Sequence, residues 1–275
     1  MATRTYQQQV VMKDLSELNK IYLVPLADWH IGDKNSAIDI IQGYVDWIAE
    51  RPNAYTILNG DLINGATKES SAELYDDLTT PDQSYAIVRE LLEPIKDKIL
   101  MITRGNHEEA IYRKVGADYM ARLGYDLDVP YKPDGGMVGL RLSISDKNSH
   151  IGMCWIYATH GWGGARTIGA KVKKAQDLMQ VAEAHVYVLS HDHTQNINRG
   201  NILEPPRTHI RLDRPLYMTT KRKLFVNTGG FIRYAGYIQR KGYTPQDLGT
   251  PRVRIELKRD GGGNGVYHVD LHASI

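Results

Sequence analysis

Five short polar segments of the chain contain residue types that bind metal ions. Each segment follows an apolar run that predicts a β-strand, at residues 21–26, 55–58, 99–103, 151–158 and 185–189. The segments are Asp28-Trp29-His30, Gly60-Asp61, Gly105-Asn106-His107-Glu108, Thr159-His160-Gly161 and Ser190-His191-Asp192-His193. Polar side chains at five successive strand ends indicate one shared site rather than five separate turns.

The chemistry of these side chains predicts two divalent ions. Asp, His and Asn supply oxygen and nitrogen donors without thiolates, which favours Mn²⁺ first and Fe, Zn, Ni or Co as alternatives. The candidate ligands are Asp28, His30, Asp61, Asn106, His160, His191 and His193. Seven ligands are too many for one ion, and a bridging carboxylate, here Asp61, holds two ions about 3.5–4 Å apart. Such pairs clamp both oxygens of a phosphoryl transfer.

The ordered set D-x-H, G-D-x-x-N, G-N-H-E, a lone His and H-x-H resembles the calcineurin-like metallophosphoesterases, over residues 21–231. The resemblance implies one metal on Asp28, His30, Asp61 and His193, and a second on Asp61, Asn106, His160 and His191. A hydroxide between the metals would attack phosphorus, while His107 would contact a phosphate oxygen or protonate the leaving group. Glu108 or Asp33 is expected to orient His107. Asn64 stands where many relatives carry Asp, which affects ligand orientation rather than ligand number.

The order of elements predicts an α/β fold. Amphipathic helices alternate with buried strands in the first half, and antiparallel strands dominate the second. We expect a four-layer α-β-β-α sandwich of two mixed sheets, which the resemblance also implies. Residues 1–275 form one expected domain, with a polar lead-in at 1–20 and a C-terminal hairpin at 251–275. We expect a short helical turn at 14–18 and helices at 36–50, 84–93, 106–123 and 167–183.

The composition is that of a globular protein, with 42% hydrophobic and 24% charged residues in 275. No apolar run approaches the roughly 20 residues that span a bilayer, and residues 1–10 lack the apolar block of a secretory signal. We therefore expect a cytoplasmic protein that does not bind membranes. Cys154 cannot form an intrachain disulfide and is predicted to be buried. Nothing in the sequence predicts the oligomeric state.

The substrate is predicted from local charge, because the net charge is only +2. Arg104, Arg113 and Arg166 flank the third and fourth segments and suit phosphate recognition. Residues 205–223 are locally basic, which favours DNA or RNA as the substrate. The alternative is that these charges belong to a solvent-exposed surface without a binding role. The chain resembles the compact exonuclease-like phosphoesterases. We therefore expect a phosphodiesterase that acts on nucleic acid.

Other interpretations stay open. The polar loop at residues 65–83 is either a lid or a cover for a sheet edge, and as a lid it would suit a small nucleotide or cyclic nucleotide. A metal-stabilised scaffold without catalysis is the third possibility. His107 has an alternative role as a helix cap. The remaining histidines are predicted to be structural or surface residues: His150, His185, His209, His268 and His272.

Overall fold

The computed structural model describes residues 10–65, 77–144, 151–165, 167–205, 213, 215–236, 239, 242–259 and 267–275. Its helices are α1 (Ile38–Ala49), α2 (Pro81–Leu92), η1 (Glu93–Lys98), α3 (Asn106–Val115), α4 (Tyr119–Leu127), α5 (Ile168–Asp177) and η2 (Leu178–Gln180). Its strands are β1 (Val11–Leu15), β2 (Lys20–Leu23), β3 (Ala54–Asn59), β4 (Ile99–Thr103), β5 (Gly136–Ser143), β6 (Ile151–Thr159), β7 (Val186–Leu189), β8 (Asn196–Glu204), β9 (Thr219–Asn227), β10 (Arg252–Arg259) and β11 (Tyr267–Ser274).

The strands form two mixed sheets, as the sequence predicted. One sheet has six strands in the order β1-β5-β6-β7-β9-β8, and the other has five in the order β11-β10-β2-β3-β4. Within the second sheet, β2, β3 and β4 pair in parallel, whereas β10 is antiparallel to both β2 and β11. The alternation of apolar residues from Val138 to Ile144 predicts a strand that pairs with residues 151–158, and the antiparallel pairing of β5 with β6 confirms it. The hairpin predicted at 251–275 is confirmed by the pairing of β10 with β11.

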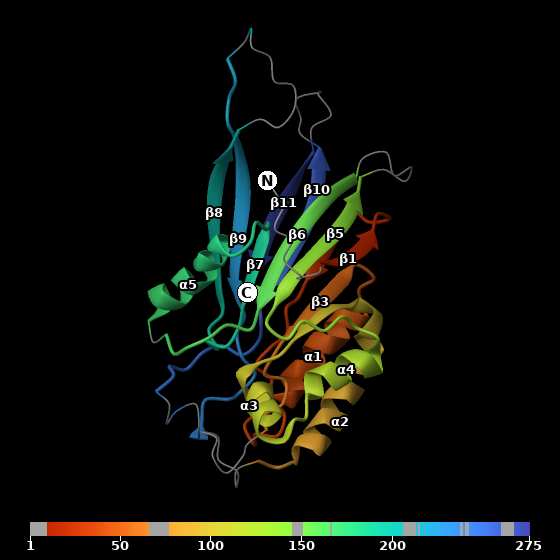
Figure 1. The fold of residues 1–275 in the computed structure, drawn as a ribbon, viewed down its shortest axis with the longest axis vertical. Coiled ribbons are helices and arrows are strands. Elements are labelled where there is room, and N and C mark those ends of the chain that lie inside the picture. Colours follow the sequence, from red (N-terminus) through yellow and green to blue (C-terminus); the bar gives the residue numbers. More distant parts are fainter. Residues whose placement is uncertain are drawn as a thin grey trace, which may run out of the picture.

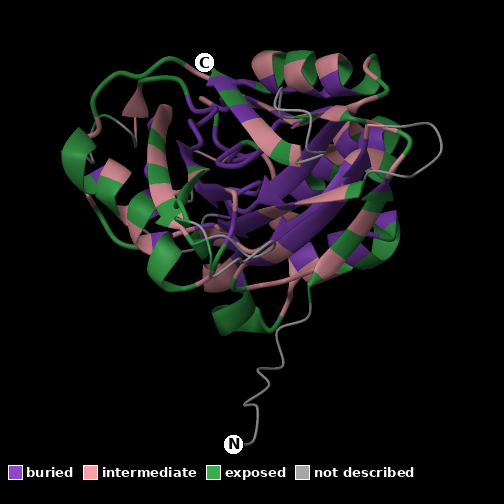
Figure 2. Ribbon diagram, turned by 90° about the horizontal axis from the view of Figure 1, so that it is seen from above, coloured by how far each residue is buried: buried purple, intermediate pink, exposed green. Residues whose placement is uncertain are grey.

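Three apolar clusters separate the layers. One cluster lies between the two sheets and includes Ile57 of β3 and Val188 of β7. A second cluster packs α1, α2 and α4 on the outer face of the five-stranded sheet, and a third packs α5 and η2 on the six-stranded sheet. The helices therefore lie outside both sheets (Figure 1), and the buried residues concentrate between them (Figure 2).

Burial explains why β3 and β4 are almost wholly apolar. Every residue of both strands is buried, because helices cover one face of their sheet and the other sheet covers the opposite face. Apart from the buried Thr56, the polar residues of these strands stand at their ends, Asn59 and Thr103, where the chain leaves the sandwich. Among the described residues, no helix is long and apolar enough to cross a membrane.

Several predicted elements differ from the structure. The helical turn predicted at 14–18 is only partly present: residues 11–15 form β1, which pairs in parallel with β5, and a turn follows in which Leu18 N–H donates to Leu15 O at 2.9 Å. The helix predicted from 106 to 123 is two helices, since Gly116 ends α3 in a left-handed conformation (φ 72°). Helix α5 stops at Asp177 and is followed by the short η2. Residues 66–76 of the predicted lid lie outside the described residues.

Candidate metal centre

The strand ends bring the predicted ligands to one place. Asp28 and His30 follow β2, Asp61 follows β3, and Asn106 begins α3 just after β4. His160 follows β6, and the His191–His193 segment follows β7. Since β2, β3 and β4 are parallel, as are β6, β7 and β9, their carboxyl ends meet at the same end of the sandwich. The spatial grouping described below therefore follows from the topology.

The backbone at these positions is unusual. Among the described non-glycine residues, six have a positive φ, and five of them are predicted ligands. The five are Asp28 (54°), His30 (48°), Asp61 (53°), His191 (72°) and His193 (49°). Left-handed conformations cost L-residues energy and persist where the surrounding structure enforces them, as at functional sites. No pattern in the sequence predicted these backbone conformations.

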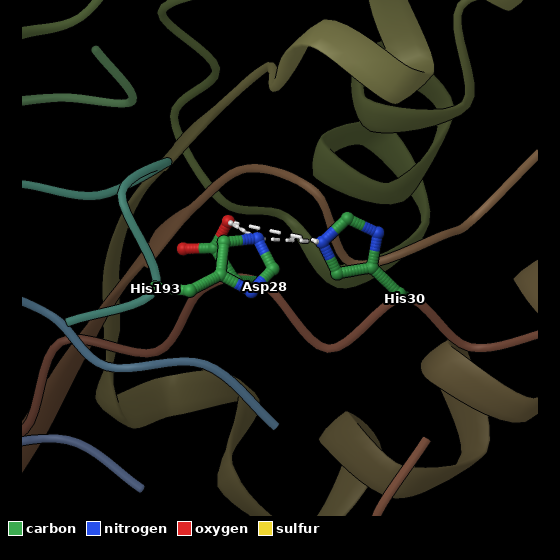
Figure 3. Close-up of side chains that lie close together, drawn as sticks. All are labelled: Asp28, His30 and His193. Carbon is green, nitrogen blue, oxygen red and sulfur yellow. Dashed lines mark hydrogen bonds and ion pairs between the residues drawn. The ribbon is translucent and has the colours of Figure 1, made fainter. Parts of the chain in front are cut away.

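The first group of ligands consists of Asp28, His30 and His193, whose side chains point toward one another (Figure 3). The Nε2 atoms of His30 and His193 are 3.3 Å apart. Asp28 Oδ1 lies 3.3 Å from His193 Nε2 and 3.8 Å from His30 Nε2. Two imidazole nitrogens and one carboxylate oxygen thus surround a common point.

The second group contains Asp61, His160 and His191, with Asn106 between them. His160 Nε2 lies 3.2 Å from both Asp61 Oδ2 and Asn106 Oδ1. His191 Nδ1 lies 2.7 Å from the same Asn106 oxygen. Asp61 Oδ2 is also 3.9 Å from His30 Nε2 in the first group, so one carboxylate oxygen faces both groups.

Backbone carbonyls fix the outward-facing nitrogens of two of these histidines. His160 Nδ1 donates to Asn59 O at 2.7 Å, and His191 Nε2 donates to Gly163 O at 2.8 Å. A carbonyl only accepts, so each of these nitrogens carries the proton and the other nitrogen of the ring is left to bind a cation. This is the support that metal-binding histidines ordinarily have.

The electrostatics of the centre also match cation binding. Burial disfavours the charged form of Asp61, but His160 and His107 outweigh it and hold the pKa of Asp61 well below its usual range. The pKa of His160 rises to about 10 because Asp61 overcomes the opposite effect of burial. Burial and the neighbouring His107 lower the pKa of His30 to about 4. Asp61 is therefore ionised and the His30 ring is neutral at pH 7, as a ligand must be, whereas His160 carries a proton that a bound metal would displace.

Asp28 gives a direct test of whether a metal fits. Its Oδ1 atom is buried and accepts no hydrogen bond of normal geometry, although His193 Nε2 lies 3.3 Å away, and the buried Nδ1 of His30 also accepts or donates none. His191 N–H donates only to the other oxygen, Oδ2, at 3.1 Å. A buried carboxylate oxygen without a hydrogen bond is costly unless a cation compensates it. The donors present therefore fit a divalent metal at this position.

His107 and Glu108 lie at the start of α3, but not in the predicted relation. His107 Nδ1 donates to Asn64 O at 2.6 Å, whereas Asp33 Oδ1 accepts from Asn35 N at 2.7 Å. The prediction that Glu108 or Asp33 orients His107 is therefore wrong. The sequence could not show that the backbone of Asn64 lies there.

Glu108 instead joins two of the ligand loops. Its buried carboxylate accepts from four backbone N–H groups: Asp61 (2.9 Å), Leu62 (2.6 Å), Ile63 (3.0 Å) and Gly105 (3.0 Å). Burial and the nearby Asp61 raise the pKa of Glu108 to about 7. The carboxylate ties the segment carrying Asp61 to the one carrying Asn106 and His107.

Close backbone packing explains two glycines of the motifs. A Cβ atom added at Gly60 would lie 2.5 Å from Gly105 N and 2.8 Å from His160 Nδ1. One added at Gly105 would collide with the Asp61 carboxylate. Glycine is required at both positions because the two loops touch through their backbones.

Sequence reasoning missed three residues that hold the ligands. The buried Asn59 side chain donates to Thr159 O and Ser190 Oγ, which links the ends of β3, β6 and β7. Lys171 of α5 donates to Asp192 O at 2.9 Å, and Lys174 pairs with the Asp192 carboxylate at 3.0 Å. Lys171 and Lys174 are three residues apart, which places them on one side of a helix and could have indicated a shared contact. Nothing in the sequence indicated the role of Asn59.

The predicted substrate arginines are placed as follows. Arg104 pairs with Asp118 at 2.8 Å and with Glu109, and it lies over the Tyr112 ring. Arg113 is exposed and pairs with Glu109 at 2.6 Å. Arg166 lies outside the described residues. Arg104 is thus occupied by acidic neighbours.

The basic segment at 205–223 is described only in part. Of its cations, Lys221 and Lys223 pair with Glu183, and Arg222 lies 3.5 Å from Asp270. Lys223 is completely buried. Arg207, Arg211 and Arg214 fall outside the described part of the chain. The three described cations are therefore compensated by carboxylates.

Comparison with known proteins agrees with the geometry of the site. A family model described as calcineurin-like phosphoesterase matches residues 24–195, more than half of the chain, and this span contains all seven predicted ligands. Such phosphoesterases are metal-dependent in general. None of the curated proteins matches the sequence.

Two solved structures of Vps29 from Chaetomium thermophilum are similar to the chain. One has 13% identity and a TM-score of 0.37, and covers 92% of this chain and 95% of its own. The other, complexed with the RaPID-derived cyclic peptide RT-D3, has 16% identity and a TM-score of 0.36, and covers 93% and 96%.

Proposed function

The chain belongs to the calcineurin-like phosphoesterase family, and from that premise we propose that it is an enzyme that hydrolyses phosphodiester bonds with two divalent metal ions. The observation that carries the proposal is the position of Asp61 Oδ2, which faces His160 Nε2 at 3.2 Å and His30 Nε2 at 3.9 Å. A single carboxylate between two sets of donors is the arrangement that a two-metal site needs.

In this proposal, Asp28, His30, Asp61 and His193 hold one ion, and Asp61, Asn106, His160 and His191 hold the other. When bound, the two ions supply an activated water and neutralise charge on the phosphate. The carboxylates and the neutral imidazole nitrogens provide the binding energy. Asn59, Gly163 and Glu108 keep the ligands in place through hydrogen bonds. Mn²⁺ is the proposed metal, since the ligands are oxygen and nitrogen donors and include no thiolate.

His107 is the proposed catalytic residue. Its Nδ1 is bonded to Asn64 O, which leaves Nε2 to face the space beside His30, whose ring centroid is 4.5 Å away. His107 also stands in the first turn of α3, where the positive end of the helix dipole favours an anionic phosphate. We assign Nε2 the role of donating to a phosphate oxygen or giving its proton to the departing oxygen.

The occupied Arg104 favours a diester over a monoester. A diester phosphate carries one negative charge, whereas a monoester carries up to two and benefits from an additional arginine. Asp118 and Glu109 engage Arg104. In the described part of the site, the positive charge that compensates the phosphate would therefore come mainly from the bound metals.

Hydrolysis with added Mn²⁺ tests the proposal. The substrates are bis-p-nitrophenyl phosphate, p-nitrophenyl phosphate, and single- and double-stranded DNA. We expect the diester to turn over, Asp61→Ala to lose both metals and activity, and His107→Ala to retain metal while the rate falls by about 10²–10⁴-fold. His268→Ala, at an exposed histidine of β11, is the control. Bound Mn²⁺ without turnover of any substrate would refute the proposed function.

A further inference from the structure

Trp162 lies between two residues that belong to the metal centre. It is two residues after His160 in the loop between β6 and α5 (Figure 1). The next residue, Gly163, accepts the hydrogen bond of His191 Nε2 at 2.8 Å. Two residues span at most about 7 Å, so the Trp162 backbone adjoins both histidines of the second ligand group.

The backbone of Trp162 is held in place. Lys174 donates to Trp162 O at 2.8 Å and also contacts both carboxylate oxygens of Asp192, at 3.0 and 3.1 Å. One lysine thus ties the Trp162 loop to the segment between His191 and His193. The indole is carried by a fixed element beside the centre.

The Trp162 side chain is nevertheless 54% exposed. All four tryptophans lie within the described residues, and the other three are buried or half-buried, Trp29 completely. Scattered exposed apolar residues are normal on protein surfaces. Trp162 differs in being anchored by residues of the metal centre while its flat apolar face stays in contact with water.

We propose that Trp162 stacks on an unpaired nucleobase next to the scissile phosphate, and that the substrate is therefore single-stranded nucleic acid. This inference rests on the proposed function and names its substrate class. An exposed indole whose backbone adjoins the ligand histidines suits a planar group linked to a phosphodiester, and stacking accepts any base because every base has a π-face. It also requires no basic track, which agrees with the pairing of Lys221, Arg222 and Lys223 with acidic residues.

The test compares two oligomers of equal length and charge, oligodeoxythymidylate and an abasic oligomer, as substrates of the full-length protein with Mn²⁺. We expect Trp162→Ala to lower kcat/KM on oligodeoxythymidylate by about 5- to 150-fold, mainly through KM. The preference for the base-bearing oligomer should shrink by the same factor. Trp162→Phe should restore most of it. Tyr125→Ala, at an 89% exposed aromatic of α4, should change neither rate.

A second readout does not need turnover. The fluorescence of the exposed Trp162 should be quenched by a phosphorothioate oligodeoxythymidylate and not by the abasic oligomer, and Trp162→Phe should abolish the quenching. If the wild-type protein cleaves the small diester but Trp162→Ala keeps the same base preference, the inference is wrong and the proposed function stands. If the wild-type protein cleaves no phosphodiester at all, both fall.

Discussion

Replacing Glu108 by Gln removes one acceptor oxygen without changing the size of the side chain. Oε1 accepts from Leu62 and Ile63, and Oε2 accepts from Asp61 and Gly105. The amide nitrogen of Gln cannot accept, so two buried N–H groups lose their partner in either orientation. Each loss costs about 1–3 kcal/mol, which gives about 2–6 kcal/mol for the variant. At about 2–4 °C per kcal/mol, Tm should fall by roughly 4–24 °C.

Metal binding should weaken as well, because the two loops that Glu108 joins carry Asp61 and Asn106. Loss of such a supporting contact typically costs 10–100-fold in affinity. Thermal unfolding of the metal-free proteins gives the first quantity, and titration calorimetry with Mn²⁺ gives the second. Glu90→Gln, at an exposed position of α2, controls for the loss of one negative charge. A Glu108→Gln protein that unfolds within about 2 °C of the wild type and binds Mn²⁺ equally well would show that these hydrogen bonds do not hold the loops.

Three further predictions concern the ligands. Asp28→Asn should bind one Mn²⁺ per chain where the wild type binds two, whereas Asp61→Asn should lose both, because Asp61 Oδ2 faces both groups; elemental analysis after dialysis counts the ions. Metal binding should release a proton at pH 7.5, and the affinity for metal should increase as pH rises toward 10. Burial lowers the pKa of His160, but Asp61 raises it to about 10, and a protonated ring cannot bind metal. Equal calorimetric enthalpies of binding in buffers of different ionisation enthalpy would contradict this prediction. Gly105→Ala should weaken Mn²⁺ binding at least tenfold, because its Cβ would displace Asp61, whereas Gly43→Ala, with open space around it, should bind normally.

The apolar strands and their polar ends were predictable because each carries its own local signal. Burial on both faces makes β3 and β4 largely apolar, with Thr56 the one polar residue inside them, and the metal-binding residues follow these strands closely. The order of the motifs then predicted the family, which the family model confirms. The bounds of β4 and the pairing of β5 with β6 followed from the same patterns.

The errors arose where distant contacts decide the local structure. Residues 11–15 form a strand because β5 pairs with them, and no nearby residue indicates that partner. Gly116 ends α3 although the helical pattern continues on both sides of it. Glu108 was expected to orient His107, but in the folded chain its carboxylate accepts hydrogen bonds from the loop that carries Asp61. Which backbone group meets a side chain depends on how loops cross, and sequence periodicity does not contain that information.

The left-handed ligands show what the fold contributes to the centre. A strained backbone costs about 1–3 kcal/mol per residue and persists only where its surroundings enforce it. Here the Asp28 and His30 N–H groups donate to Gly60 O and Asp61 O, both at 3.0 Å, and Phe231 N–H donates to Asp28 O at 3.0 Å. These bonds lie between backbone groups and do not involve the metal-binding atoms. The ligand positions are therefore set by the backbone of the sandwich, so isosteric changes at the ligands should remove metals without unfolding the chain.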